Sequence, residues 1–476
     1  MAESLKKKTA KGLAWATIER LAGQGVQFLV TILIARILTP RDFGLVGMLT
    51  VFIHVAQALI DGGFSQALIR KQDRTEADNN TVFYFNIIVS ALLYGVLYLT
   101  APFVADFYNE PQLKSMMQVL CLLIVVNSFG AIQRTLFTAQ INFRTQAYVS
   151  AISSVVSGIL AIIMAYKGFG VWTLVYQQLL NAVFNTVLLW TYSKWRPRLL
   201  YSWQSFKSLF AFGSNLMIGS LLDSFFDNVY QIVVGKIFSA STLGFYSQAR
   251  TIAYLPSANT TGILSRVTYP VMSSISNDDK RLKTDYRKLL RVTAFVIFPL
   301  MCTLAGISKP LIAILLGERW SFSATLLLPL SLSLMWYPVH ALNLNLLKVK
   351  GRSDLFLRLQ IYKKVIVVVV LLLTIPFGIV FMCYCRIGTS IFVLSINTYY
   401  TGKLLNLGFF KQMQDLLPTL LLSLAIFFVM LVLCSLFDNV YLQLLVPAVS
   451  GITIYLGVAK ILHFQELTDL ISLIRR

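Results

Sequence analysis

The stretch Ala35–Gly44, ARILTPRDFG, returns 200 residues later as Gly235–Gly244, GKIFSASTLG. The two copies share charge, shape or size at matching positions, which are Arg36 and Lys236, Ile37 and Ile237, Thr39 and Ser239, and Gly44 and Gly244. Each copy lies between two long apolar runs. The repeat therefore predicts two related halves, in which the same connection joins the first helix to the second.

The apolar runs around these copies are long enough to cross a membrane. The chain has 476 residues, of which 57% are hydrophobic and 13% charged, and its mean hydropathy is +0.71. These values exclude a soluble globular protein and a disordered one. A spanning helix needs about 20 mostly apolar residues, so we predict about fourteen spans. They cover 14–36, 43–66, 82–105, 115–138, 148–166, 170–192, 209–235, 244–275, 288–307, 322–347, 363–382, 384–402, 416–437 and 440–462.

Basic residues are concentrated in alternate loops of this arrangement. The chain carries 41 Lys and Arg against 20 Asp and Glu, a net charge of +21. Because cytoplasmic loops carry the excess of Lys and Arg, both termini are predicted to be cytoplasmic. Nucleic acid is not the expected partner, since long apolar runs separate the basic tracts. The basic N-terminal segment leads into a first transmembrane helix rather than a removable signal peptide.

The repeat also predicts how the spans are grouped. Each repeat contains an even number of spans, which returns the chain to the same side, so the halves run in parallel about an axis along the membrane normal. We predict an N-lobe over 1–192, a basic and aromatic interfacial linker over 193–208, and a C-lobe over 209–402. Two additional helices and a tail occupy 403–476.

Charged residues away from the ends of the predicted spans fall in the first two helices of each half. A charge at the bilayer centre costs about 2.5–3.5 kcal/mol on insertion scales, so such residues are candidates for function. They are Glu19, Arg20, Asp61, Asp223, Asp227, Arg250 and Arg266. In a transporter with two lobes, these helices would face a shared central cavity.

The arginines and the carboxylates point to different roles. Guanidinium groups stay charged when buried and bind phosphate oxygens bidentately, so Arg20, Arg250 and Arg266 are candidate ligands of an anionic head group. Asp223 and Asp227 are four residues apart and share one helix face, which suits a proton or cation site. The alternative, in which they form structural ion pairs with Arg250 or Arg266, stays open.

Three further charged residues are candidates for coupling or gating. They are Glu19, Asp61 and Arg70; Arg70 lies at the inner end of the second helix and is alternatively an ordinary cytoplasmic loop charge. The sequence contains no catalytic motif and no Gly-rich phosphate loop. Its five Cys and three His show no metal-ligand spacing. We therefore predict no catalytic residue, no metal site and no cofactor, and ATP is not the direct energy source.

The helix pattern, the basic start and the segment ARILTPRDFG followed by DGGFSQALI resemble a known family. The chain resembles the polysaccharide-exporter branch of the multidrug/oligosaccharidyl-lipid/polysaccharide (MOP) flippase superfamily, which includes O-antigen, colanic-acid and teichuronic-acid exporters. The resemblance implies an all-α polytopic membrane protein with two pseudo-symmetric six-helix lobes in a V shape like that of multidrug (MATE) transporters, plus two C-terminal helices. It implies that Arg20 and Arg250 correspond, by helix, to cavity arginines of the family.

The same resemblance implies a function. Family members move undecaprenyl-pyrophosphate-linked oligosaccharide units from the cytoplasmic to the periplasmic leaflet of the bacterial inner membrane by alternating access. The implied partners are the lipid-linked substrate, membrane lipids, H⁺ or Na⁺ as a coupling ion, and polymerase or other glycan-assembly proteins. Two alternatives stay open: a cation-coupled multidrug antiporter of the same superfamily and a flippase for the peptidoglycan precursor. A membrane-embedded glycan enzyme is disfavoured because the outer loops are short.

Overall fold

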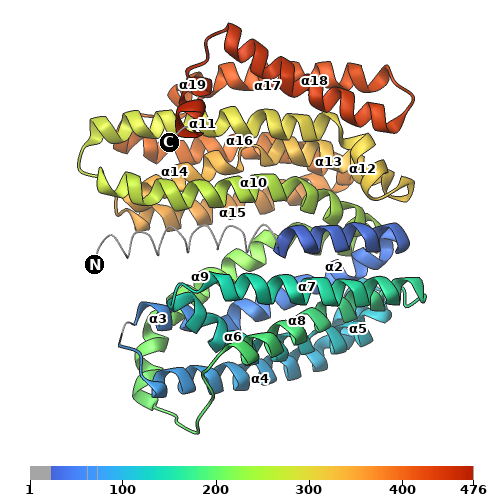
Figure 1. Cartoon of the computed structure of the whole chain (residues 1–476), viewed down its shortest axis with the longest axis vertical. Helices are drawn as coiled ribbons and strands as arrows, with labels where there is room; N and C mark the ends of the chain where they lie inside the picture. The colour runs from blue at the N-terminus through green and yellow to red at the C-terminus, as the bar shows by residue number, and fades with distance from the viewer. Residues whose placement is uncertain (1–22, 62, 72, 475–476) are drawn as a thin grey trace. The chain divides into compact units, whose positions relative to one another are not determined.

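The computed structural model describes residues 23–61, 63–71 and 73–474, and those ranges are helical with no β-strand among them (Figure 1). The expectation of an all-α polytopic fold is thereby confirmed. The chain forms two compact units, Met1–Gly244 and Phe245–Arg476.

The first unit contains the helices that carry three of the predicted intramembrane carboxylates, Asp61, Asp223 and Asp227. Its described helices are Gly23–Ile37, α2 (Pro40–Asp61), α3 (Phe64–Arg70), α4 (Glu76–Tyr108), α5 (Gln112–Leu120), α6 (Leu122–Ala139), α7 (Phe143–Tyr166), α8 (Trp172–Tyr192), α9 (Trp203–Ile237) and the start of α10 (Ala240–Ser274).

The second unit continues from α10. Its elements are α11 (Asp279–Gly306), α12 (Ser308–Leu315), the 3-10 turn η1 (Glu318–Trp320), α13 (Ser321–Leu334), α14 (Tyr337–Val349), α15 (Ser353–Thr374), the 3-10 turn η2 (Ile375–Phe377), α16 (Gly378–Leu405), α17 (Phe409–Ser435), α18 (Val440–Ile461) and α19 (Gln465–Ile474).

Within the described ranges, nine helical stretches are long and apolar enough to cross a membrane. The total of about fourteen spans therefore stays a prediction. One of the nine, Asp354–Leu405, contains two of the predicted spans. The structure divides it at η2 and Gly378, whose φ of 86° lies in the left-handed region that a glycine adopts without strain. The break thus lies a few residues before the predicted boundary, and α15 begins earlier than expected.

In the first unit, α9 packs on α2, α3 and α4, while α6 and α7 pack on α8. A buried apolar cluster at one end of this unit joins Phe64, Leu68, Phe83, Ile132 and Leu209. This cluster fixes α3 and the first turns of α9 against α4. The division of the chain into lobes at the 193–208 linker stays a prediction, since the helix that follows the linker packs within the first unit.

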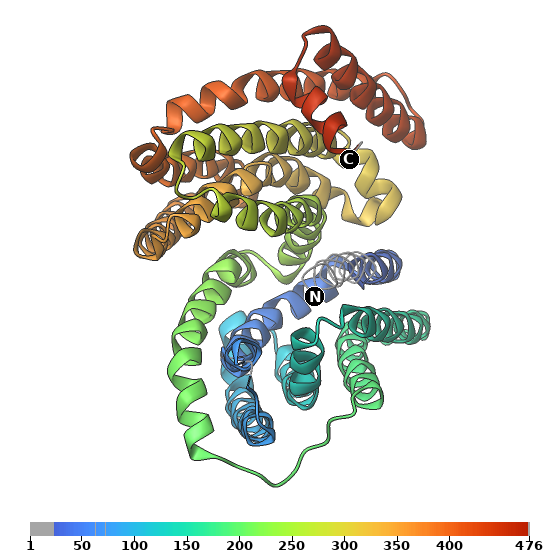
Figure 2. The same cartoon turned by 60° about the vertical axis from the view of Figure 1, so that its left-hand side comes forward.

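The linker itself is irregular over residues 193–202, and Figure 2 shows it as a coil from the end of α8 to the start of α9. It is attached to the first turns of α4 by three hydrogen bonds. The Trp195 indole donates to Glu76 Oε2 at 2.9 Å, and the backbone N–H groups of Arg198 and Ser202 donate to the side chains of Asn80 and Thr81.

In the second unit, α17 packs along α11, and α18 packs on α17. Arg287 of α11 forms two hydrogen bonds with the carboxylate of Asp415 on α17, at 2.7 and 2.5 Å. Such a bidentate pair fixes both the distance and the orientation of the two helices. The helices after residue 403 are therefore packed into this unit through α11.

Candidate functional site

The predicted site residues are only partly within the described structure. Glu19 and Arg20 lie outside the described residues. Asp61 ends α2 and Arg266 lies in α10, but their side chains are outside the described part. The predicted grouping of these four residues around a cavity stays a prediction.

Asp223 and Asp227 lie one turn apart on α9, and both are exposed. The next residue, Asn228, is buried and donates to Ser224 O at 2.7 Å, and its amide lies 3.4 Å from Nδ1 of His54 on α2. The polar face of α9 thus continues from an exposed pair of carboxylates to a buried contact with α2. This arrangement gives the two carboxylates one common side of the helix, as their spacing predicts.

Arg250 is half-buried in α10. It belongs to the second unit, whereas Asp223 and Asp227 belong to the first. Each residue is therefore placed within its own unit, and both roles considered for them, ligand binding and ion pairing, stay predictions.

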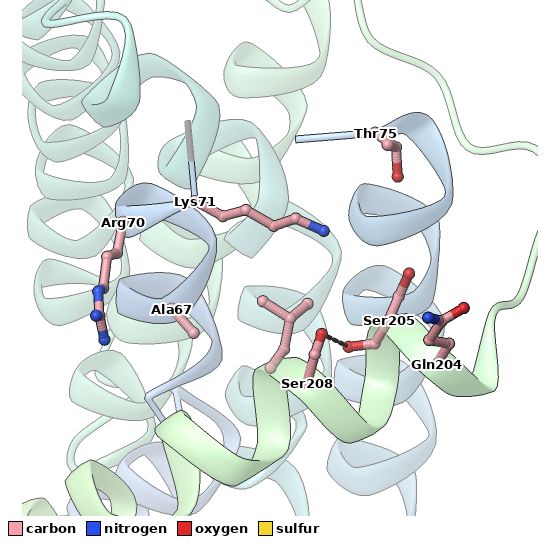
Figure 3. Close-up of a pocket in the computed structure, with 8 residues that line it drawn as sticks. Ala67, Arg70, Lys71, Thr75, Gln204, Ser205 and Ser208 are labelled. Carbon is pink, nitrogen blue, oxygen red and sulfur yellow. Dashed lines mark hydrogen bonds between the residues drawn. The ribbon is translucent and has the colours of Figure 1, made fainter. Parts of the chain in front are cut away.

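Arg70 is the predicted site residue whose surroundings the structure describes in most detail. It lines a pocket of about 600 Å³ at the end of the first unit, between the end of α3, the start of α4 and the start of α9 (Figure 3). A pocket of this size lies within the range of small-molecule sites. Its lining residues are Ala67, Arg70, Lys71, Thr75, Gln204, Ser205, Ser208 and Leu209.

The wall of this pocket is organised by Asp78, which is fully buried in the first turn of α4. Its Oδ2 accepts hydrogen bonds from Lys71 Nζ at 2.8 Å and from the hydroxyl and backbone N–H of Thr75 at 2.9 Å each. Thr75 and Asp78 form a capping box that satisfies the first N–H groups of α4. The hydrogen bond to Asp78 holds the Lys71 ammonium at the pocket wall. Figure 3 shows the Lys71 side chain extending across this wall from the end of α3.

The opposite wall comes from the first two turns of α9. Ser202 caps this helix by accepting from the N–H of Ser205 at 3.2 Å, and the Ser208 hydroxyl donates to the carbonyl of Ser205 at 3.0 Å. Beneath them, Leu209 belongs to the apolar cluster described above. The pocket therefore has a polar, cationic rim and an apolar floor.

A second polar feature lies between helices of the second unit. Asn343 of α14 and Gln412 of α17 exchange two amide hydrogen bonds of 3.0 Å, and Thr401 of α16 donates to the same Asn343 oxygen at 2.9 Å. Nearby, His340 lies between Asn397 and Ser390 at 2.9 and 3.2 Å. These contacts favour a packing role for His340, because its ring nitrogens link α14 to α16.

The site residues predicted from the sequence are all charged, so the neutral residues that line the pocket were missed. Thr75, Ser205 and Ser208 are examples. The pattern T-x-x-D at residues 75–78 is a helix-start signal that would have placed Thr75 at a cap next to Lys71. No comparable local pattern brings Ser205 and Ser208 to the same place. Among the described residues, no group of three or more His, Cys, Asp and Glu has a metal-binding arrangement.

Comparison with known proteins covers most of the chain. Teichuronic acid biosynthesis protein TuaB of Bacillus subtilis (strain 168) is 25% identical over 355 residues, which cover 74% of this chain and 73% of that protein. Succinoglycan biosynthesis transport protein ExoT of Rhizobium meliloti (strain 1021) is 25% identical over 330 residues, covering 69% of this chain and 66% of that one.

A solved structure shares the fold. The lipid II flippase MurJ in its inward closed conformation matches with a TM-score of 0.75 at 15% identity, over 96% of this chain and 99% of that chain. The chain thus shares the fold of that protein, and with its long apolar helices this confirms the predicted all-α, multi-pass membrane architecture. A family model described as "Polysaccharide biosynthesis protein" matches residues 33–325. Because this match covers more than half of the sequence, the chain belongs to the polysaccharide biosynthesis protein family.

Proposed function

We propose that the protein is a flippase that moves lipid-linked oligosaccharide repeat units across the membrane for surface polysaccharide biosynthesis. The observation that carries this proposal is the family match over residues 33–325. A relative named as a succinoglycan biosynthesis transport protein and a fold shared with a lipid II flippase support it. In this proposal the protein carries its substrate without converting it chemically.

The proposed substrate head is an undecaprenyl-linked pyrophosphate, which is anionic. The cytoplasm is electrically negative, and moving one negative charge outward across the membrane gains about 2.3 kcal/mol per 100 mV. The membrane potential thus favours export from the cytoplasmic to the periplasmic leaflet. A bacterial inner membrane with both termini cytoplasmic is the location that the distribution of basic loops supports.

The proposed ligands of the pyrophosphate are Arg20, Arg250 and Arg266. Half-burial of Arg250 supports this role, because a guanidinium shielded from water binds phosphate more strongly than an exposed one. A coupling ion, H⁺ or Na⁺, would act at Asp223 and Asp227, whose exposed carboxylates share one face of α9.

Coupling or gating is also proposed for Glu19, Asp61 and Arg70, on the basis of their positions in and beside the first two predicted spans. Glycan-assembly proteins such as a polymerase are the proposed partners, because a translocated repeat unit must be consumed on the outer side.

The exposed carboxylates of α9 are the one observation that favours a second function, cation-coupled export of organic cations. A single experiment separates the two. Purified protein is reconstituted into liposomes, an undecaprenyl-pyrophosphate oligosaccharide is placed in one leaflet, and its appearance in the other is measured beside the uptake of a fluorescent organic cation. Protein-dependent flipping without cation uptake supports the flippase. Cation uptake driven by an ion gradient, without flipping, would overturn it.

Variants then test the arginines. Arg250→Ala is expected to lower the flipping rate at least tenfold while leaving the yield of reconstituted protein unchanged. Arg319→Ala is the matched control, because it removes the same charge from an exposed residue of η1. Equal rates for Arg250→Ala and Arg319→Ala would remove Arg250 from the substrate site.

A further inference from the structure

We infer that the pocket between α3, α4 and α9 binds the diphosphate group of an anionic ligand. This assignment places a second anion site outside the predicted central cavity, at one end of the first unit. That the natural ligand is the lipid-linked substrate rests on the proposed function; that the pocket receives a diphosphate rests on the pocket itself.

The charge of the lining favours an anion. The lining residues include two cations, Arg70 and Lys71, and no carboxylate. Asp78, beside lining residue Thr75 in the capping box, is fully buried and accepts hydrogen bonds from Lys71 and Thr75. An ammonium has three N–H donors and the bond to Asp78 uses one, so Lys71 is held in place while it still presents donors.

The remaining lining residues add neutral polar groups. The Gln204 amide is a donor suited to phosphate oxygens, whereas the Thr75 and Ser205 hydroxyls bond to Asp78 and the Ser208 hydroxyl donates to the Ser205 carbonyl. These groups surround the pocket on two sides, because Thr75 caps α4 whereas the others lie in the first two turns of α9. Phosphate contacts in proteins combine side-chain amides with Arg and Lys, so Gln204 together with the two cations matches a diphosphate better than a neutral ligand.

The start of α9 adds a favourable dipole. Its first turn contains no acidic residue, unlike that of α4, which carries Glu76 and Asp78. The partial positive charge at a helix N-terminus is therefore not compensated by a side chain of that turn. Together with Arg70 and Lys71 in the lining, this partial charge favours an anion in the pocket.

The floor and the surroundings strengthen this preference for an anion. Ala67 and Leu209 belong to the buried apolar cluster, and an apolar floor lowers the local dielectric constant and so strengthens attraction to an anion. The linker and α9 expose three further basic residues, and electrostatic attraction raises the rate at which an anion arrives. They are Arg196, Arg198 and Lys207.

The test is a binding titration of the full-length protein in nanodiscs with two probes, inorganic pyrophosphate and farnesyl pyrophosphate. Arg70→Gln removes a lining charge and leaves the capping box of α4 intact. Ser208→Trp fills the pocket from an exposed helical position without changing any charge. Lys194→Gln is the matched control, because it removes an exposed charge of the linker that does not line the pocket.

We expect Kd for both probes to rise about tenfold or more in Arg70→Gln and Ser208→Trp, and less than twofold in Lys194→Gln. Unchanged Kd in both pocket variants would overturn the assignment. So would an equal rise in Lys194→Gln, because binding would then reflect the general basic surface. Thermal unfolding of each variant identifies any loss of binding that follows from loss of the fold.

The two probes distinguish the source of the ligand. Tighter binding of farnesyl pyrophosphate than of pyrophosphate, with both lost in the pocket variants, supports a lipid-linked ligand. Equal binding of the two supports a soluble diphosphate at the same pocket. If the wild type binds both probes in the pocket but flips no oligosaccharide in liposomes, the proposed function fails while the pocket assignment stands. If it flips normally and the pocket variants bind as the wild type does, the pocket assignment fails alone.

Discussion

Gly44 and Gly244 pack reciprocally, each against the backbone at the start of the other's helix. A Cβ atom on Gly44 would lie 2.5 Å from the carbonyl carbon of Ala240, and one on Gly244 would lie 2.7 Å from the carbonyl carbon of Pro40. Pro40 begins α2 and Ala240 begins α10. The repeat seen in the sequence is therefore also a contact, in which residues 40 and 44 of one copy meet residues 244 and 240 of the other.

This contact predicts that neither glycine tolerates a side chain. Gly244→Val would force two backbone segments apart, and overpacking of this kind costs about 1–3 kcal/mol or more. We expect a lower melting temperature and less monodisperse protein in fluorescence-detected size-exclusion chromatography. Gly95→Ala is the control, because nothing lies within 4 Å of a Cβ there and alanine is the better helix former. A Gly244→Val protein as stable as Gly95→Ala would show that the two helices separate without cost.

The bidentate pair between Arg287 and Asp415 predicts a second stability effect. The Asp415 side chain is 7% exposed, so Asp415→Asn leaves a guanidinium at the interface of α11 and α17 without its carboxylate. The expected cost is about 1–3 kcal/mol, measured as a fall in melting temperature. The Arg352–Asp354 pair is open to solvent, so Asp354→Asn serves as the comparison and should leave the melting temperature nearly unchanged. An equal fall in melting temperature for the two variants would show that burial of Asp415 does not determine the contribution of its ion pair to stability.

The reciprocal amide pair of Asn343 and Gln412 predicts energetic coupling. Each single change to alanine takes two hydrogen bonds from the other buried amide, which keeps its bonds to Thr401 or to backbone carbonyls, whereas the double change removes both amides. We expect a double-mutant cycle to give a coupling of about 0.5–3 kcal/mol. Additive single effects would indicate that the two amides act independently, despite the 3.0 Å distances.

The predicted topology is tested by labelling single cysteines in a background without the five native ones. Lys280→Cys and Lys194→Cys are exposed sites on the predicted cytoplasmic side, and we expect an impermeant maleimide to reach them only after the membrane is opened. Lys167→Cys and Lys309→Cys, exposed sites on the predicted outer side, should react in intact cells. The reverse pattern would invert the orientation.

The fold followed from the sequence to a large extent because apolar length and the 200-residue repeat are properties of the chain itself. The helix start at Thr75 was also readable, since a capping box is a local pattern. Helix breaks were less predictable. The division at η2 coincides with Pro376 and with the positive φ of Gly378 inside a continuous apolar stretch, where hydropathy gives no signal.

The candidate site was less accessible to sequence reasoning. Arg70 was singled out as a charge near the second helix, yet its pocket is completed by Gln204, Ser205 and Ser208, which lie more than 130 residues further along the chain. Their meeting depends on how α9 packs against α3 and α4, and such tertiary contacts leave no periodic pattern. Buried amides such as Asn343 and Gln412 are missed for the same reason, because an isolated polar residue in an apolar run does not identify its partner.

The short helix α19 has a practical consequence for work with this protein. Asp469 and Glu466 form ion pairs with Lys288 and Arg291 at 2.6 and 3.5 Å, and Glu466 is 8% exposed. The helix α19 is thus held against α11 by two ion pairs. An affinity tag or fluorescent reporter fused after α19 therefore needs a flexible spacer. Proteolytic removal of α19 would leave Lys288 and Arg291 without these carboxylates and promote binding to anionic surfaces.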